Sequence, residues 1–530
     1  MIKAVRGTRD LLPPDTALWN FVESVVREVF RAYNFQEIRT PIFESTELFA
    51  RGVGEETDIV SKEMYTWWDG DTPETVLERS WTDQYKDRYK HIEPNVRLKN
   101  RRRADFVGYR DNLPPTIVKV EYEPGMPALI DLQLLRKEWV QTDVEPTLAI
   151  GVPEKRAEYI RRLIMEGIEV QPVKMPEEYE PPSSLTLRPE ATAGIVRAYI
   201  EHKLGDRGLN KLYCMGPMFR RERPQKGRYR QFYQIDAEVI GPASAGAESP
   251  ARDAEVLEML ATLLDRLGIK GWNLELNSVG CANDRAAFNQ ALKKALEPVV
   301  GNMCADCQRR AVTNPLRVFD CKVPADQPII DTLPRISQFL DEGCRKHFDA
   351  VKEILSKVGV LFTLNDRLVR GLDYYTRTAF EFTHGALGAQ NAILGGGRYD
   401  GLSEALGGPA APGIGFAIGE DRLVMSLQES TPAENIVTKP EVYIAPLGTG
   451  MNPEAARLAR ELRRHDVVVD LGGETFRLKK SFEAATKAGA IYILIVGENE
   501  VKADAFALKN LATGEQVSVP RAELAQKIRG

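Results

Sequence analysis

The segment that most restricts how this chain can fold runs from Phe219 to Glu238, because it joins two strand-like stretches through a charged turn. Six basic side chains lie between Arg220 and Arg230, around a Pro-Gln-Lys-Gly turn. Alternate side chains of a strand project from one face, so several guanidinium groups can point together at a phosphate-bearing ligand, which arginine binds bidentately. A charged hairpin that faces only solvent is the alternative explanation of this run.

The second strand of this hairpin predicts the floor of a ligand site. Gln234 and Glu238 are four residues apart and therefore share one face of the strand with Phe232. Two polar side chains beside an aromatic ring on one sheet face suit the recognition of a small polar ligand.

A second cluster combines a cation with phenols. Arg370 precedes a glycine and is followed by Tyr374 and Tyr375, and Tyr399 lies in the glycine-rich segment 395–401. A fixed guanidinium and phenolic donors where the backbone can approach closely are compatible with ligand binding, although the pattern alone is weak.

A third cluster, residues 413–422, is a glycine-punctuated apolar strand that runs into a helix with Arg422 in its first turn. A cation is unfavourable at the start of a helix, so Arg422 indicates a bound anion that offsets it. A surface arginine without a ligand is the alternative.

Composition restricts the class of protein. The 530 residues contain 71 Lys and Arg against 76 Asp and Glu, a net charge of −5, so any nucleic-acid site must be a local patch. No apolar run reaches the length of a membrane span, and the N-terminal sequence lacks a signal-like segment, which predicts a soluble protein of the cytoplasm. The five histidines are scattered and no Ser/His/Asp or HExxH pattern occurs, so hydrolase functions are unsupported.

The order of these clusters closely resembles the three motifs of class II aminoacyl-tRNA synthetases, in the version of the histidyl-tRNA synthetase family. The resemblance rests on six stretches: Arg6-Gly-Thr-Arg-Asp10, the first motif (motif 1) around Pro41, Leu187-Arg-Pro-Glu-Ala-Thr-Ala193, the Phe219-Arg220 hairpin, Arg370-Gly-Leu-Asp-Tyr-Tyr375 and the Arg422 motif. It implies an α+β fold: an antiparallel catalytic sheet with a helical insertion, followed by a C-terminal α/β anticodon-binding domain.

The expected domain organisation combines this resemblance with changes in composition. The expected parts are the catalytic core with motif 1 (1–68), an unassigned insert (69–184), the core with motif 2 (185–285), the helical insertion (286–364), the core with the histidine motif and motif 3 (365–430), a linker (431–440) and the anticodon-binding domain (441–530).

The resemblance implies a two-step reaction, in which histidine attacks the α-phosphate of ATP and is then transferred to the 3′ end of tRNA(His). Arg220 and Arg370 would be the catalytic cations at the α-phosphate, with no protein nucleophile. Arg422 would hold the γ-phosphate, Phe232 would stack on adenine and Glu222 would meet its edge. ATP is expected to carry Mg²⁺, without assigned protein ligands.

The same resemblance implies a histidine pocket in which a buried carboxylate and a phenol face the imidazole nitrogens. A wrong side chain would leave those groups unpaired, and this explains discrimination physically. The expected histidine-binding residues are Glu190, Thr192, Gln234, Glu238, Arg370, Tyr374, Tyr375 and Tyr399. Arg223 and Gln225 are candidate tRNA contacts, and motif 1 implies a homodimer.

Two rival functions remain on sequence alone. One is a non-catalytic synthetase paralogue that regulates histidine biosynthesis, although such proteins usually lack the phosphate-binding arginines and the anticodon-binding domain. The other is an RNA-binding or sensor module without aminoacylation, which would require a damaged ATP site. The chain retains Arg220, Arg370 and Arg422, so synthetase activity is favoured.

The resemblance leaves two segments unexplained. The insert 69–184 matches nothing in the family pattern, and we expect a decoration without a distinct function, with an extra RNA or protein contact through Lys99–Arg103 as the alternative. Cys304 and Cys307, with Cys321, Cys344 and His347, are ligand types suited to zinc, but only the first pair has knuckle-like spacing. Buried thiols without metal are the expected state.

Overall fold

The structure is a computed structural model that describes every residue except 1, 55–56, 99–101, 123, 125, 140–143, 164–166, 177–181, 226, 370–371, 373, 388–390, 429–435 and 438. The chain divides into two compact units. The first comprises residues 1–9 and 28–426, and the second comprises residues 10–27 and 427–530.

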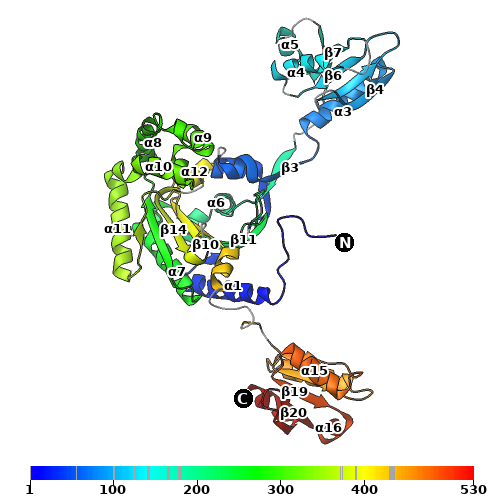
Figure 1. The fold of residues 1–530 in the computed structure, drawn as a ribbon, viewed down its shortest axis with the longest axis vertical. Helices are drawn as coiled ribbons and strands as arrows, with labels where there is room; N and C mark the ends of the chain where they lie inside the picture. The colour runs from blue at the N-terminus through cyan, green and yellow to red at the C-terminus, as the bar shows by residue number, and fades with distance from the viewer. Residues whose placement is uncertain are drawn as a thin grey trace. The chain divides into compact units, whose positions relative to one another are not determined.

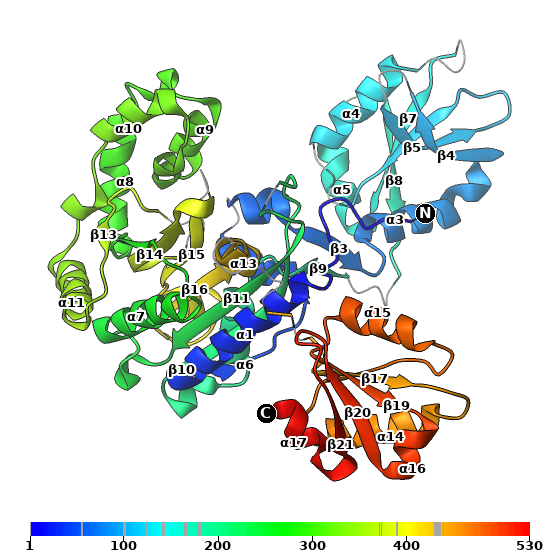
Figure 2. The same cartoon turned by 60° about the horizontal axis from the view of Figure 1, so that its bottom comes forward.

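The first unit is built on an eight-stranded sheet (Figures 1 and 2). Its six inner strands, from β10 to β12, are antiparallel, and the short edge strands β1 and β13 pair in parallel with their neighbours. The strand order is β1 (Gln36–Glu37), β10 (Asn210–Phe219), β11 (Gln231–Ile240), β16 (Gly413–Gly419), β15 (Ala392–Arg398), β14 (Thr376–His384), β12 (Trp272–Ser278) and β13 (Thr363–Leu364).

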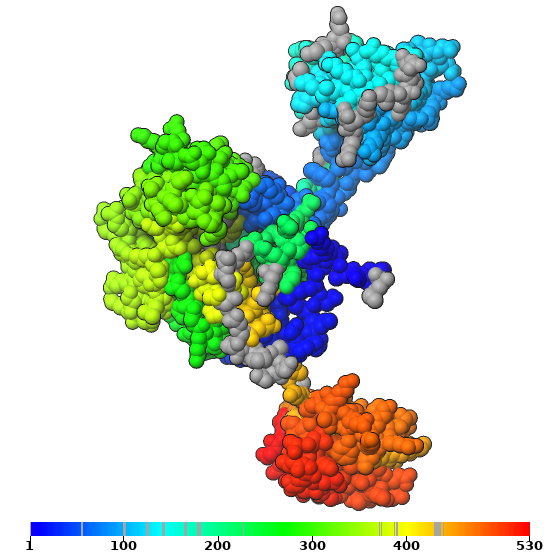
Figure 3. Space-filling model, in the orientation of Figure 1, coloured from blue at the N-terminus to red at the C-terminus, as the bar shows by residue number. Residues whose placement is uncertain are grey.

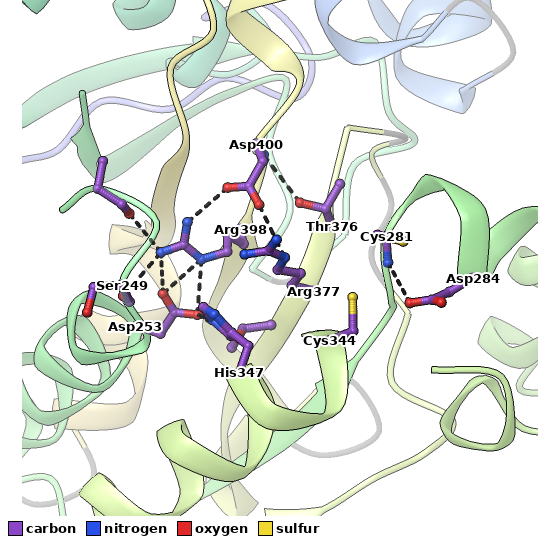
Figure 4. A network of polar contacts seen from close by, with 12 residues as sticks. Ser249, Asp253, Cys281, Asp284, Cys344, His347, Thr376, Arg377, Arg398 and Asp400 are labelled. Atoms are coloured by element: carbon purple, nitrogen blue, oxygen red, sulfur yellow. Dashed lines mark hydrogen bonds and ion pairs between the residues drawn. The ribbon is translucent and has the colours of Figure 1, made fainter. Parts of the chain in front are cut away.

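Helices α7 (Pro250–Arg266) and α11 (Glu342–Val358) pack against each other and contact the sheet. A buried ion network joins them to β15 (Figure 4). Arg398 of β15 and Asp253 of α7 are both fully buried and 2.7 Å apart, and His347 of α11 contacts the same carboxylate at 2.8 Å. Burial alone would raise the pKa of Asp253, but Arg398 and His347 hold that pKa below its ordinary value.

A second, three-stranded sheet has the order β2 (Phe43–Ser45), β9 (Ser183–Leu187) and β3 (Tyr65–Asp69). After β9 the chain enters helix α6 (Thr192–Glu201), which contacts β11. Two further helices of the first unit are α2 (Thr46–Val53) and α12 (Leu402–Ala405), with a π-helical turn at Ile59–Glu63. Helices α1 (Asp15–Ala32) and α13 (Glu420–Gln428) each contain residues of both units.

The segment between β3 and β9 has its own five-stranded sheet and its own apolar core, so it is more than an irregular loop. The buried Trp81 donates its indole N–H to Gln171 at 2.7 Å within this core. The elements are α3 (Pro73–Tyr85), β4 (His91–Arg97), β5 (Arg103–Tyr109), β6 (Thr116–Val120), α4 (Met126–Lys137), β7 (Thr147–Pro153), α5 (Glu154–Leu163) and β8 (Ile168–Val173).

Between β12 and β13 the chain is helical, as the sequence predicts. The helices α8 (Ala282–Leu296), α9 (Ala305–Thr313) and α10 (Gln327–Thr332) precede α11 and share an apolar core that includes Phe288, Cys307 and Cys321. In the space-filling view the segment from α8 to α11 forms a green to yellow-green lobe (Figure 3).

The C-terminal residues form an α/β domain, but the sheet is mixed where the sequence indicated a parallel one. Strands β18, β17 and β19 are parallel, whereas β20 and β21 continue the sheet antiparallel. These last two strands mix buried residues with partly or fully exposed ones, so they carry no long apolar run that would reveal them. The elements are β17 (Val442–Pro446), α14 (Asn452–Arg463), β18 (Val469–Leu471), α15 (Leu478–Ala488), β19 (Tyr492–Val496), α16 (Glu498–Ala503), β20 (Ala505–Asn510), β21 (Gln516–Pro520) and α17 (Leu524–Arg529).

Candidate active site

A cavity of about 340 Å³ opens over the inner strands of the eight-stranded sheet. Its walls come from β11, the hairpin before it, the start of α6, and strands β14, β15 and β16. Nine residues expected from the sequence line it: Glu190, Thr192, Arg220, Glu222, Phe232, Gln234, Tyr374, Tyr375 and Arg422.

The hairpin fixes Arg220 at the wall of the cavity. Strands β10 and β11 pair from Phe219 with Gln231 to Asn210 with Ile240, which leaves the basic residues in the connecting turn. Arg220 donates from Nε to the carbonyl oxygen of Pro189 at 2.9 Å, and its guanidinium lies over the Phe232 ring, 5.1 Å from the centroid. The guanidinium is therefore oriented before any ligand binds.

A second cation approaches from the third cluster. Arg422, in the first turn of α13, donates to the carbonyl oxygen of Ala392 at 2.7 Å. Burial, and then the nearby Arg228, lower the pKa of its guanidinium, so an anion here would relieve both effects. Arg228 in turn forms a 3.0 Å ion pair with Glu222, which places a carboxylate between cations at the cavity wall.

The floor of the cavity holds buried carboxylates. Glu190 accepts hydrogen bonds from the backbone N–H groups of Thr192 and Ala193 at 2.8 and 2.9 Å, where α6 begins. The Thr192 hydroxyl donates to Glu238 at 2.7 Å. Burial raises the pKa of Glu238 to about 8. The charge of Glu238 therefore depends on which group pairs with it.

Several buried oxygens of this floor lack partners in the part of the chain that the structure describes. The carbonyl oxygen of the Gln234 amide and both carboxylate oxygens of Asp236 make no hydrogen bond, although water cannot reach them. The Tyr399 hydroxyl lies near Glu238 without a hydrogen bond of good geometry. Such buried polar atoms are costly unless a ligand satisfies them, so the floor fits a small molecule with several N–H donors.

Glycines create the space for these side chains. A Cβ at Gly415 of β16 would lie 1.6 Å from the Glu238 carboxylate, and one at Gly413 would lie 2.3 Å from the Tyr399 ring. A Cβ at Gly397 of β15 would lie 2.9 Å from the Tyr375 ring. The glycines of β15 and β16 thus leave space on one side of the sheet for the side chains of one glutamate and two tyrosines.

The aromatic side of the cavity is a cluster of three tyrosines. The rings of Tyr374 and Tyr375 are 4.7 Å apart, and Tyr374 meets Tyr399 edge-on at 5.9 Å. Burial, followed by the neighbouring Tyr375, raises the pKa of Tyr374 well above its ordinary value, so its phenol is a hydrogen-bond donor at neutral pH.

The remaining sequence predictions fall elsewhere. Glu238 and Tyr399 do not line the cavity surface but support it through Thr192 and Tyr374. Arg223 and Gln225 are exposed in the hairpin turn, away from the cavity lining. Arg370 lies outside the described residues, as do Lys99 to Arg101 of the insert's basic run.

Three features of the site escaped sequence reasoning. Asp236 shares the strand face of Gln234 and Glu238, so the alternation that singled out those two could have found it. Arg228 is one of the six basic residues between Arg220 and Arg230, and nothing in the sequence assigns it a separate role. Arg9 ion-pairs with Asp421 at 2.6 Å across 412 residues of sequence, and the second Asp421 oxygen accepts the backbone N–H of Tyr233 at 3.1 Å.

Comparison with known proteins extends over the whole chain. A family model described as histidyl-tRNA synthetase matches residues 178–423, and one described as an anticodon binding domain matches residues 441–530. Histidine–tRNA ligases of Koribacter versatilis and Solibacter usitatus are 55% and 47% identical over all of this chain and 96% and 99% of their own lengths. The crystal structure of apo S. aureus histidyl-tRNA synthetase is 30% identical, with a TM-score of 0.65 over all of both chains.

The antiparallel sheet and the cavity above it are those of a class II aminoacyl-tRNA synthetase. Sequence identity of 55% and 47% with two histidine–tRNA ligases over the full chain decides the family within this class. The chain belongs to the histidyl-tRNA synthetases. The insert between β3 and β9 falls within the length over which the two relatives align. Membership implies the use of ATP and of a tRNA.

Proposed function

We propose that the protein activates L-histidine with ATP to give histidyl-adenylate and transfers the histidyl group to the 3′ end of tRNA(His), with activation in the cavity over β11. The observation that carries this assignment is the floor of unpaired buried oxygens on Gln234 and Asp236, beside the raised pKa of Glu238. Histidine brings an α-ammonium group and a ring N–H, which are the donors this floor lacks.

The polar groups divide between the two ends of the amino acid. Glu190, Gln234 and Asp236 would surround the α-amino group and its neighbouring carbons. Glu238 and Tyr375 would face the imidazole nitrogens, with Tyr374 and Tyr399 completing the pocket. An amino acid without a ring N–H would leave Oε2 of Glu238 buried and unpaired, which costs binding free energy and gives selectivity.

ATP would occupy the cationic side of the cavity. Arg220 would contact the α-phosphate and the substrate carboxylate, and Arg422 would hold the γ-phosphate. Arg370, by family resemblance, would approach the α-phosphate from the opposite side. Because the carboxylate of histidine is itself the nucleophile, the protein's contribution is to hold it in line and to balance the charge that develops on phosphorus.

The position of Phe232 modifies the adenine proposal. One face of this ring already carries the Arg220 guanidinium, so adenine would stack on the ring from the other side, toward Arg422. Glu222, which is held by Arg228, would meet the adenine edge.

Mg²⁺ fits the same side of the cavity. The carboxylate of Glu381 is an oxygen donor of the kind Mg²⁺ binds, and it lines the cavity. The ion would neutralise phosphate charge as it enters with ATP.

The outer parts of the protein support transfer to tRNA and dimer formation. The exposed Arg223 and Gln225 would meet the acceptor end, and residues 441–530 would bind the anticodon. Ile42, Phe43, Trp67 and Trp68 are 39–56% exposed around β2 and β3, and such an apolar surface fits a partner copy, hence a homodimer. In the described residues no helix is both long and apolar enough to span a membrane. We place the protein in the cytoplasm, where ATP and tRNA(His) are available.

The regulatory paralogue is the weaker candidate, because the relatives that match this chain from end to end are histidine–tRNA ligases. The test is pyrophosphate exchange into ATP with each of the twenty amino acids. We expect exchange with histidine alone, its loss in Arg220→Ala, and normal rates in Glu342→Gln, a change on the exposed surface of α11. Absence of exchange with every amino acid would refute the ligase assignment.

A further inference from the structure

The six cysteines are unpaired, and five of them lie in the helical insertion or at its start. The sequence placed Cys304, Cys307, Cys321, Cys344 and His347 in one candidate group, but the structure divides the cysteines into two groups. Cys304, Cys307 and Cys321 gather around Asp326, whereas Cys344 belongs to a separate group with Cys281. His347 is not a member of either group because its ring is bound to Asp253.

The first group has the size of a tetrahedral metal site. One ligand atom from each of Cys304, Cys307, Cys321 and Asp326 lies within 4.8 Å of all the others. The Sγ atoms of Cys304 and Cys321 are 3.9 Å apart, and Cys321 Sγ is 3.2 Å from Asp326 Oδ2. With zinc–sulfur bonds of about 2.3 Å, a tetrahedron has edges of about 3.8 Å, so the ligand atoms need to move little.

The charge at this site also calls for a cation. Asp326 is 2% exposed, its carboxylate is bonded to the Cys304 backbone and the Cys321 thiol, and it forms no salt bridge within the described residues. Its oxygens accept the backbone N–H of Cys304 at 3.2 Å. A buried carboxylate without a cation is costly, and a divalent ion would compensate it.

The backbone around the cysteines favours thiolates. Cys304 is the N-cap residue of α9 and Cys307 lies in its first turn, where the helix dipole stabilises negative charge. The backbone N–H of Val323 donates to the Cys321 sulfur at 3.4 Å.

The second group is a poorer metal site because both of its carboxylates already accept backbone hydrogen bonds. Asp284 accepts the backbone N–H groups of Cys281 and Asp341 at 3.0 and 2.9 Å. Asp341 caps α11 by accepting the N–H of Cys344. Figure 4 shows Cys281, Asp284 and Cys344 beside the buried ion network, with the Cys281 backbone bonded to Asp284.

We propose that Cys304, Cys307, Cys321 and Asp326 bind one structural zinc ion in the helical insertion. Three thiolates and one carboxylate suit zinc, which takes four ligands of these types in closed sites. The ion joins the start of α9 to the loop that leads into α10, two segments that also meet through the Cys304 backbone N–H and the shared apolar core. It stabilises the insertion without taking part in the reaction.

The test is the zinc content of the full chain, purified, equilibrated with a mild chelator and measured by inductively coupled plasma mass spectrometry. We expect about one zinc per chain, and a loss of at least tenfold in Cys304→Ser and in Cys321→Ser. Cys281→Ser, in the second group, is the matched control and should retain the ion.

Two further measurements keep the outcome clear if a serine variant folds poorly. Replacing zinc by Co²⁺ in the wild-type chain should give the thiolate charge-transfer and d–d absorption bands of a tetrahedral site. Alkylation mapped by mass spectrometry should label the half-buried Cys304 only after the metal is removed. A wild-type chain without metal, a Cys304–Cys321 disulfide, or zinc that is lost in Cys281→Ser instead would each overturn the proposal.

Discussion

Gly415→Ala offers the sharpest test of how the sheet makes room for substrate recognition. The added Cβ would lie 1.6 Å from Glu238 Oε2 and 2.8 Å from the carbonyl oxygen of Ala237, whereas real Cβ contacts stay beyond 3.0 Å. The Glu238 carboxylate must therefore move by roughly 1.4 Å, the difference between the two distances. A displacement of about 1 Å at a positioning group costs up to about a hundredfold in rate.

The assay is pyrophosphate exchange with separate titrations of histidine and ATP. We expect KM for histidine to rise about 30- to 100-fold, which corresponds to roughly 2 to 3 kcal/mol of lost binding, while KM for ATP changes less than about threefold. Thermal unfolding monitors the cost of overpacking, about 1 to 3 kcal/mol.

A double-mutant cycle with Glu238→Ala distinguishes displacement of this side chain from general damage. If Gly415→Ala acts by moving Glu238, the double variant should lose little more than Glu238→Ala alone. Additive losses in the cycle, or an unchanged KM for histidine in Gly415→Ala, would refute the reasoning.

Three other predictions follow from the same contacts. Arg398→Met leaves Asp253 buried without its cation, and we expect a loss of about 3 to 5 kcal/mol in the free energy of unfolding, measured with denaturant at pH 7. Folding raises the pKa of Glu238 from 4.5 to about 8, so the folded state binds a proton more tightly than the unfolded state. The free energy of unfolding of the histidine-free chain should therefore fall as pH rises from 4.5 to 8. Glu238→Gln should flatten that part of the profile, and a wild-type profile that is already flat would contradict the assigned burial. Arg9→Ala removes a half-exposed cation from Asp421, and kcat/KM for ATP should fall about two- to fivefold with KM for histidine unchanged; equal effects on both substrates would contradict this role.

The parts of the site that sequence predicts best are those set by local periodicity. The hairpin and the strand face of Gln234 and Glu238 follow from alternation over a few residues, because a strand has a period of two. The order of the motifs, and hence the class II sheet, came from resemblance to a family rather than from propensity. Periodicity alone would not have placed β16 beside the hairpin of β10 and β11, because β16 comes from a distant part of the chain.

What sequence could not supply is the set of partners across those distances. The pairing of Arg9 with Asp421 and the space that Gly415 leaves for Glu238 depend on the folded register of strands. The cysteines show the same limit: spacing indicated Cys304 and Cys307, but the carboxylate of Asp326 becomes a candidate ligand only when the loop after Cys321 folds back.

The site tolerates two long inserted segments because the two ends of each segment lie on paired strands. The segment 70–182 begins at the end of β3 and returns at β9, which pairs with β3, so its ends are neighbours. The helical excursion likewise leaves β12 and returns at β13, which pairs with β12. Even for a flexible chain, lengthening a turn of about 4 residues to one of about 110 costs only roughly 3 kcal/mol in closure entropy, and a folded insert with adjacent ends costs less. Glu190, which follows β9, therefore keeps its place beside Gln234 of β11 whatever the inserts become, and the inserts are free to acquire cores and metal ligands of their own.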